Sequence, residues 1–333
     1  MYDSTQFLGA GAGVLTSFLW VLTSLFFAAA GRRIGVTAVN VLRIVLAIVL
    51  LAGAHLWRFG DLVPDVASNT QIVYLALSGL IGLALCDQAL FTAFLDIGPR
   101  RALLCMTASP IFAAILGEFV LGETIPWIGY AGIAIAIAGI AVVVTQRSAA
   151  DRSDASGVNS PRPSRIRRGY ILALLAAFSQ AAGGMFSKWG MGVGIVEPGQ
   201  EMDPMAATLV RMVFGLFGMA PIVLVHLWMI RNRRSEAEIR GERISGMALT
   251  ACGAVVGPFL GVWMSLVAFR YIEIAAAQTL ASLSPVFILP FAHFMLKDRV
   301  GPRAITGAFV ALGGAAILAF APQLAANLSG AGL

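Results

Sequence analysis

One acidic residue lies unusually deep in an apolar stretch of this sequence. Asp87 stands well inside the apolar segment 71–95. A carboxylate at such a depth is costly unless it faces a cavity or a partner, so Asp87 is a candidate for function. Cation recognition and proton coupling are the functional interpretations. A neutral aspartic acid that hydrogen-bonds to a neighbouring helix is the structural alternative, and the sequence alone leaves both open.

Other polar residues recur at helical spacing. Gln278, Ser282 and Pro285 stand at positions i, i+4 and i+7, so they form one stripe on a helix. Thr107 and Pro110 occupy the corresponding stripe in the first half of the chain. Each proline frees a backbone carbonyl one turn before it, which water or a substrate can use. We therefore predict helix kinks at Pro110, Pro258 and Pro285.

Tryptophan and glutamine exchange places between corresponding positions of the two halves of the chain. Trp20 corresponds to Gln180, and Gln88 corresponds to Trp263. Across a twofold axis this exchange would give a cavity one aromatic wall and one amide wall. Thr16 shares a helical face with Trp20. Packing between helices, with amide hydrogen bonds, is the alternative for any one residue. As a set, the polar positions predict a substrate site made of Thr16, Trp20, Asp87, Gln88, Thr107, Gln180, Trp263, Gln278 and Ser282.

Two arginines, Arg43 and Arg211, stand one or two turns inside apolar segments at corresponding positions of the two halves. Long basic side chains in such positions can snorkel to the nearest lipid headgroups, and this interpretation is favoured. The alternative is a role in gating or anion contact, for example as a salt bridge with an acid of the facing loop.

The composition indicates which solvent surrounds these residues. Of the 333 residues 59 % are apolar and 12 % are charged, and the mean hydropathy is +0.85. A water-soluble protein has roughly 25 % charged residues, so lipid is the expected solvent. A membrane-spanning helix needs about 20 largely apolar residues. Ten segments meet this requirement, and they cover residues 7–30, 38–57, 71–95, 101–121, 125–145, 170–190, 205–230, 246–269, 274–296 and 302–322.

An internal repeat relates the two halves of the chain at one constant offset. Ser109-Pro110 falls on Ser284-Pro285, and glycines match at several further positions, which shared hydrophobicity does not explain. Each half has five spans, an odd number, so the second half must enter the bilayer inverted. The predicted fold is an all-α integral membrane protein of ten helices in two inverted five-helix repeats. The expected parts are a first repeat 1–146, a basic linker 147–168, a second repeat 169–322 and a C-terminal tail 323–333.

These motifs resemble those of a known family. Arg43 in the second span, Ser109-Pro110 in the fourth and the Leu121-Gly122-Glu123 turn have echoes in the second half, and nearly the whole chain takes part. In this respect the sequence is similar to the EamA family of the drug/metabolite transporter superfamily. The resemblance implies a ten-span carrier of the bacterial inner membrane, often an exporter of amino acids or other metabolites. It also implies that spans 1, 3, 4, 6, 8 and 9 surround a central cavity, with 5 and 10 peripheral.

The distribution of positive charge predicts orientation. Eighteen of the 23 Lys and Arg residues lie in the loops on one side of the predicted spans, and three lie on the other. Because loops rich in Lys and Arg stay in the cytoplasm, the linker 147–168 is expected to be cytoplasmic, with both termini outside.

The leading functional hypothesis is a secondary transporter, an exporter of small metabolites such as amino acids that works by alternating access. A proton-coupled carrier and an uncoupled facilitator are equally consistent. The alternatives are efflux of multiple drugs or cationic compounds and, less favoured, a membrane-embedded enzyme or lipid-handling protein. Catalytic and phosphate-binding motifs are absent from the sequence, so we expect no enzyme activity, no cofactor and no metal. No disulfide and no nucleic-acid partner are expected, and the chain is expected to function as a monomer in the lipid bilayer with a small-molecule substrate.

Overall fold

The computed structural model describes most of the chain. The described residues are 4–65, 68–116, 119–120, 126–145, 163–197, 200–230, 240–272, 274–284, 287, 302–319 and 324–325. The predicted linker is therefore described only from residue 163, where a helix begins, and Pro285 lies outside the described residues.

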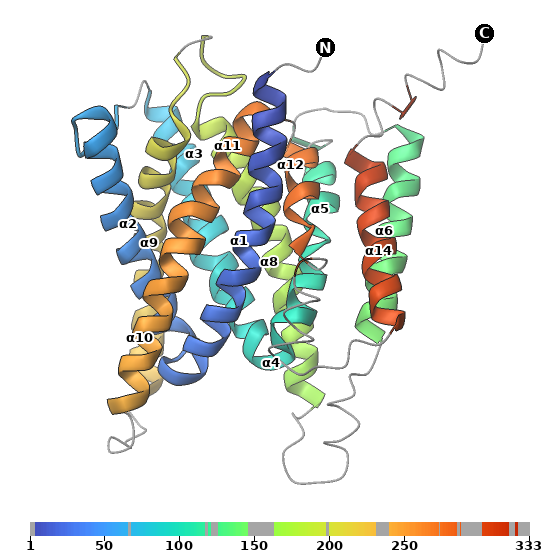
Figure 1. Cartoon of the computed structure of the whole chain (residues 1–333), viewed down its shortest axis with the longest axis horizontal. Helices are drawn as coiled ribbons and strands as arrows, with labels where there is room; N and C mark the ends of the chain where they lie inside the picture. The colour runs from blue at the N-terminus through green and yellow to red at the C-terminus, as the bar shows by residue number, and fades with distance from the viewer. Residues whose placement is uncertain are drawn as a thin grey trace.

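All regular elements of the described residues are helices (Figure 1). In chain order they are α1 (Ser4–Ile34), α2 (Val36–Phe59), α3 (Asn69–Gly79), η1 (Leu80–Leu85), α4 (Cys86–Met106), α5 (Ser109–Leu116), α6 (Trp127–Thr145), α8 (Pro163–Gly190), α9 (Pro204–Ile230), α10 (Arg240–Ala254), η4 (Val255–Gly261), α11 (Val262–Tyr271), α12 (Ile274–Ala281) and α14 (Pro302–Ala319). The two η elements are short π-helical segments.

Six helical stretches of the described residues are long and apolar enough to cross a membrane, and they coincide with predicted spans 1, 2, 3, 6, 7 and 8. They cover Phe7–Ile34, Val36–Phe59, Asn69–Pro99, Pro163–Gly190, Pro204–Val225 and Arg243–Tyr271. Shorter apolar helices at Arg101–Leu116, Trp127–Gly139 and Ile305–Gly314 fall in predicted spans 4, 5 and 10. The all-helical prediction is confirmed, whereas the count of ten spans stays a prediction.

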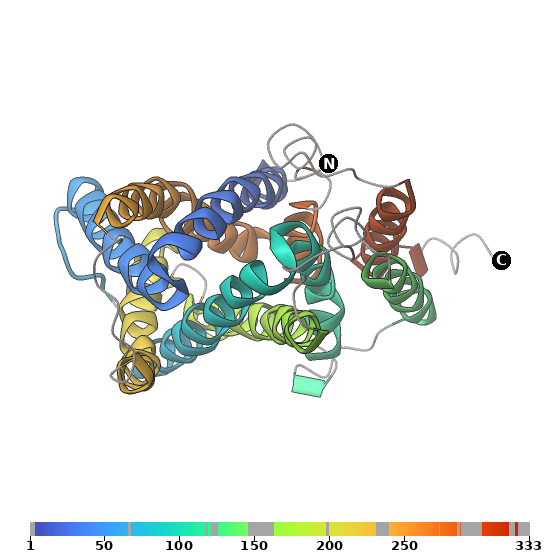
Figure 2. The ribbon, with the colours of Figure 1, turned by 90° about the horizontal axis from the view of Figure 1, so that it is seen from below.

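The helix axes are roughly aligned, and the chain runs along them in both directions (Figure 1). The helices α6 and α14 stand side by side at the edge of the bundle (Figures 1 and 2). These two helices pack mainly against each other, and the others enclose the centre of the molecule. In Figure 1, α1 runs downward from the upper end and α8 runs upward from the lower end. The turn between α1 and α2 lies at the lower end, together with the first residues of α8 and α10.

Two long helical stretches change their winding at corresponding positions. The π segment η1 joins α3 to α4, and η4 joins α10 to α11. Their first residues, Leu80 and Val255, are related by the same offset as Ser109 and Ser284. Short π segments within α-helices occur frequently at functional sites. Pro258 lies buried within η4, and Asp87 stands in the first turn of α4, just after η1.

Predicted spans 4 and 9 are interrupted rather than continuous. A turn at Thr107 and Ala108 separates α4 from α5, and a turn at Ser282 and Leu283 ends α12. Pro110 stands in the first turn of α5, where its missing N–H removes no helical hydrogen bond. Below the turn, α4 is itself broken at Gly98 (φ 82°), which reverses the chain at the lower end in a conformation that favours glycine.

Close contacts between α6 and α14 are reciprocal. A Cβ atom added at Gly139 would lie 2.3 Å from the backbone nitrogen of Ala311, and one added at Gly314 would lie 2.3 Å from that of Ala136. The repeat relates these two contacts to each other, since Gly139 corresponds to Gly314 and Ala136 to Ala311. Such close backbone approach is typical of membrane helices, which associate through van der Waals packing because lipid provides little hydrophobic driving force.

This packing gives a stability prediction. Gly139→Ala is expected to destabilise the protein by about 1–3 kcal/mol, because the added methyl group meets the backbone of α14. Gly53→Ala is the matched control, since nothing lies within 4 Å of its added Cβ, and its stability should stay within about 1 kcal/mol of the parent. Thermal unfolding in detergent measures both, and equal midpoints would contradict the proposed contact.

Candidate functional site

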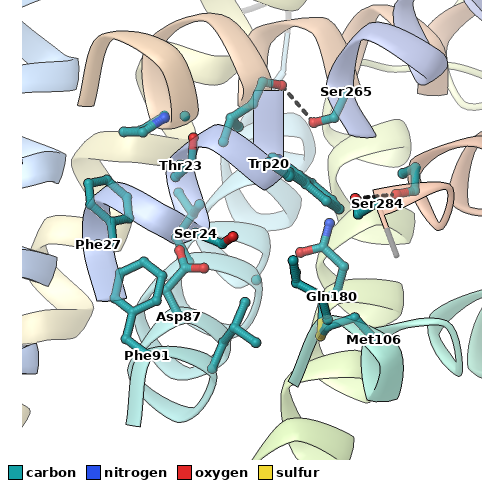
Figure 3. Close-up of a pocket in the computed structure, with 18 of the residues that line it drawn as sticks. Trp20, Thr23, Ser24, Phe27, Asp87, Phe91, Met106, Gln180, Ser265 and Ser284 are labelled. Atoms are coloured by element: carbon teal, nitrogen blue, oxygen red, sulfur yellow. Dashed lines mark hydrogen bonds between the residues drawn. The ribbon is translucent and has the colours of Figure 1, made fainter. Parts of the chain in front are cut away.

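A small central cavity lies among helices from both halves of the chain, with a volume of about 70 Å³. A space of this size holds only a few water molecules. Trp20, Ser24 and Phe27 of α1 lie around it together with Asp87 and Gln180 (Figure 3). Its lining residues are Trp20, Thr23, Ser24, Phe27, Arg43, Gly82, Leu83, Asp87, Leu90, Phe91, Phe94, Leu103, Met106, Ser109, Gln180, Arg211, Gly257, Pro258, Val262, Ser265, Gln278, Ala281, Ser282 and Ser284.

A buried ion pair joins α2 to α4 at the wall of this cavity. Arg43 is only 2 % exposed, and its Nη2 donates a hydrogen bond to Oδ2 of Asp87. Its Nε and Nη2 also donate to Oδ1 of Asn40, at 2.9 and 2.7 Å. Asn40 stands one helical turn before Arg43, so the same face of α2 provides both groups. The carboxylate of Asp87 is therefore already neutralised by a partner within the protein.

Two aromatic rings complete the surroundings of Arg43. Its guanidinium carbon lies 5.1 Å from the ring centroid of Phe91 and 5.9 Å from that of Phe27. The two rings are in turn 5.1 Å apart and tilted. A cation over an aromatic face is attracted by the ring quadrupole, most strongly where water is excluded. Arg43 is thus held by a carboxylate, an amide and two rings.

Arg211 of α9 also lines the cavity, but in different surroundings. It is 2 % exposed, and its Nε is buried without a hydrogen-bond partner. Its Nη2 lies at the crossing of η1 with α8, where a Cβ atom added at Gly82 would come within 2.6 Å of it. Among the residues that the structure describes, no carboxylate lies within ion-pairing distance of this guanidinium.

Amide hydrogen bonds connect the helices on the opposite side of the cavity. Gln278 of α12 donates through Nε2 to the backbone carbonyl of Gln180 at 3.4 Å, and its Oε1 accepts from Oγ of Ser109 at 3.2 Å. Ser284 donates to the backbone carbonyl of Ser17 at 3.1 Å. Trp20 and Gln180 point toward one another across the space in Figure 3. Segments from both halves therefore meet at this wall.

The structure brings together part of the predicted substrate site. The predicted residues that line the cavity are Trp20, Asp87, Gln180, Gln278 and Ser282, joined by Arg43, Arg211 and Pro258.

The remaining predicted residues of the substrate site lie away from the cavity. Thr16 and Thr107 donate to backbone carbonyls of their own helices. Gln88 bonds to Thr37 and Asn40 of α2, and Trp263 packs beside Phe259. The Trp20–Gln180 pair therefore faces the centre, and its counterpart at 88 and 263 does not.

The interpretation of Arg43 and Arg211 as snorkelling residues is wrong. Both guanidinium groups are buried among the helices, and Arg43 pairs with an acid of a neighbouring span rather than of a facing loop. A further residue, Asn40, was missed. Its position one helical turn before Arg43 was the available signal, because such residues share a helical face. The serines at 24, 109, 265 and 284 were also missed.

Charged contacts lie near both ends of the helices. Near the start of α8, a segment at the lower end in Figure 1, the buried carboxylate of Asp96 accepts two hydrogen bonds from Arg168, both at 2.8 Å, and lies 3.5 Å from Nε of Arg165. At the upper end, Lys188 donates to the backbone carbonyl of Ile272, and Arg270 donates to that of Met202. These contacts join α4 to α8 at the lower end and connect the second-half helices at the upper end.

The long apolar helices are those of a multi-pass membrane protein. A model of the EamA-like transporter family matches residues 7–145 and again 167–320. The chain belongs to the EamA-like transporter family, whose members are transporters of the drug/metabolite type, not enzymes. This finding confirms the resemblance deduced from the motifs.

A solved structure shares the fold of this chain. One crystal structure, described only as that of a protein, matches with a TM-score of 0.60 and 18 % sequence identity, over 95 % of this chain and 96 % of that chain. Among the curated proteins, none matches the chain.

The ion pair gives a second prediction. Arg43→Gln and Asp87→Asn should each destabilise the protein by about 3–5 kcal/mol, because each leaves the opposite charge buried and unpaired. The double variant removes both charges and should lose less stability than the sum of the single changes. Unfolding of all four proteins in detergent measures the coupling, and strictly additive losses would show that the two charges do not depend on each other.

Proposed function

We propose that this protein is a secondary transporter that exports small metabolites such as amino acids by alternating access, with the substrate bound in the central cavity. The observation that carries this proposal is the central cavity with its few charged and amide side chains, because α1, α4, α8, α11 and α12 all contribute to its wall. A membrane protein buries polar and charged groups at its centre only at a cost, and such groups mark substrate pathways.

The proposed architecture is ten spans in two inverted repeats, with boundaries at 1–146 and 169–322. The opposite directions of α1 and α8 support it (Figure 1). The π segments at corresponding positions and the reciprocal contacts of Gly139 and Gly314 support it as well. Inverted repeats allow two conformations of similar energy, one open to each side, because exchanging the conformations of the halves interchanges the two openings.

The positions of the arginines support the proposed orientation of the protein in the membrane. Arginines at the lower end in Figure 1 include Arg32 and Arg33 after the first span, and Arg165, Arg167 and Arg168 at the start of α8. The positive-inside rule assigns this end to the cytoplasm. We place the protein in a bacterial inner membrane, with the linker 147–168 in the cytoplasm.

The contacts at the two ends correspond to the two gates that alternating access requires. Asp96 joins α4 to α8 at the cytoplasmic end through Arg168, and Arg270 and Lys188 fasten the helix ends on the other side. The cavity between them is small, so a substrate enters only when one set of contacts opens. The two sets would open in turn as the transporter changes conformation.

A transport experiment tests the proposed substrate position. Proteoliposomes containing the protein are expected to exchange radiolabelled amino acids by counterflow. Trp20→Ala removes an aromatic wall and should raise KM about tenfold or more for the preferred amino acid. Trp57→Ala is the matched control, because Trp57 is 89 % exposed on α2. This variant should transport with the KM of the parent protein. Wild-type kinetics of the Trp20 variant for every amino acid, or no exchange at all, would contradict the proposal.

The cytoplasmic gate can be tested separately. In a background without Cys86, Cys105 and Cys252, a cysteine introduced at Ser24 reports access to the cavity. Asp96→Asn weakens the contact with Arg168 and should increase labelling of this cysteine by an impermeant thiol reagent from the cytoplasmic side about tenfold.

The matched control for the gate is Asp65→Asn, which changes an exposed carboxylate at the other end. Its labelling should equal that of the parent. Equal labelling of the Asp96 variant and the parent would show that this contact does not close the cavity.

A further inference from the structure

The charged residues of the cavity do not balance. Its described lining contains two arginines, Arg43 and Arg211, and one acid, Asp87. Arginine stays protonated in proteins, so the wall has one positive charge in excess. An uncompensated buried charge is unfavourable, and a ligand of opposite charge would remove this cost.

Asp87 interacts electrostatically with both arginines but is hydrogen-bonded only to Arg43, so Arg211 is the arginine without an ion-pair partner of its own. A comparison of the two halves explains this difference. At the offset that relates Ser109 to Ser284, the acid Asp87 corresponds to Val262, and the ring of Phe91 corresponds to Leu266. At the offset that relates Arg43 to Arg211, Asn40 corresponds to Thr208, whose hydroxyl donates instead to the carbonyl of Pro204.

Phe27 likewise corresponds to Ser187, at the offset that relates Trp20 to Gln180. The hydroxyl of Ser187 donates to the carbonyl of Gly183. At each of these corresponding positions, a group that holds Arg43 is therefore replaced by an uncharged residue that cannot form an ion pair with Arg211.

The fold nevertheless keeps room for this guanidinium. Gly82 and Gly183 lie against each other at the crossing of η1 with α8, and a Cβ atom at Gly82 would meet both Nη2 of Arg211 and the Cα of Gly183. The Nε of Arg211 is buried without a partner while the residue lines the cavity. A guanidinium with free donors in a site of low dielectric is a strong receptor for a carboxylate, because it can form two parallel hydrogen bonds.

The other side chains around the cavity indicate the rest of the ligand. Apolar and aromatic groups form much of its wall, including Trp20, Phe94, Leu103 and Met106. These groups favour an apolar body over a second charge. The only acid in the described wall, Asp87, is engaged by Arg43 and is poorly placed to attract a cation.

We propose that Arg211 binds the carboxylate of the transported substrate, a small organic acid or amino acid with an apolar body, in place of the acid that the second repeat lacks. This inference rests on the proposed substrate cavity and narrows its ligand class. It argues against the efflux of cationic compounds that the sequence left open.

Three probes that share a phenylethyl group and differ in charge test the proposal in purified protein. They are 3-phenylpropionate, phenylalanine and phenethylamine. A ligand that binds the folded state raises the unfolding midpoint. At least one of the two carboxylates is expected to raise it, and phenethylamine is expected to have no effect. Stabilisation by the amine, or none by either carboxylate, would overturn the proposal.

Substitution of the arginine tests which residue binds. Arg211→Gln should weaken carboxylate binding about 10- to 100-fold. The Arg211→Gln substitution should not lower the unfolding midpoint of the ligand-free protein, because the arginine that it removes carries an unpaired buried charge. Arg58→Gln is the control, since Arg58 pairs with Asp203 away from the cavity, and it should bind as the parent does. Unchanged binding by the Arg211 variant would refute the assignment.

A substitution at Val262 gives an independent test that keeps the arginine. Val262→Asp places an acid in the second repeat at the position that corresponds to Asp87 in the first. The new carboxylate should pair with Arg211 and abolish carboxylate binding. Val262→Asn has the same size without the charge and should retain binding. Equal binding by the two variants would contradict the proposed role of the missing acid.

These outcomes separate the inference from the proposed function. Arg211-dependent binding of carboxylates without counterflow in proteoliposomes would support the site and refute transport of these compounds. Counterflow of phenethylamine but of neither carboxylate would support a transporter and refute the assigned ligand class.

Discussion

A polar group that this protein removes from water can find a hydrogen-bond partner only within the protein, because the hydrocarbon core of the bilayer offers none. The ion pair of Arg43 and Asp87 is the clearest consequence of this constraint. Four neighbours from three helices hold one guanidinium, and the same contacts bring α1, α2 and α4 to the wall of the cavity. The polar interior therefore determines which helices surround the centre and which, like α6 and α14, stand outside.

The two halves agree in their scaffold and differ in their site. Glycine contacts and π segments recur at the repeat offset, since close packing of helices makes the same demands on each half. The residues around the two arginines do not recur. Asp87 has Val262 as its counterpart, so Arg43 has an acid hydrogen-bonded to it and Arg211, which lines the same cavity, has none. In our proposal, function arises at this departure from the repeat.

Much of the fold could be predicted from patterns of hydrophobicity. Long apolar segments such as 7–30 and 246–269 became helices of the expected extent, because spanning a membrane requires a fixed length of apolar helix. The Ser-Pro motif of the fourth span indicated a kink, but the structure has a turn at Thr107 and a new helix after it. Local sequence does not distinguish a bent helix from a broken one, because neighbouring helices provide the hydrogen bonds that decide between them.

The candidate site was less predictable. Asp87 could be selected by its depth alone, and Trp20, Gln180 and Gln278 by their spacing, because these are properties of single helices. The partner of Asp87 could not, since snorkelling and pairing leave the same pattern in one helix. The amino-acid sequence by itself determined that the chain is a membrane protein with a repeated plan and a few buried polar residues. Only the tertiary structure decided that Arg43 forms an ion pair with Asp87 and that Arg211 has no ion-pair partner among the described residues, because ion pairs form between helices that are distant in sequence.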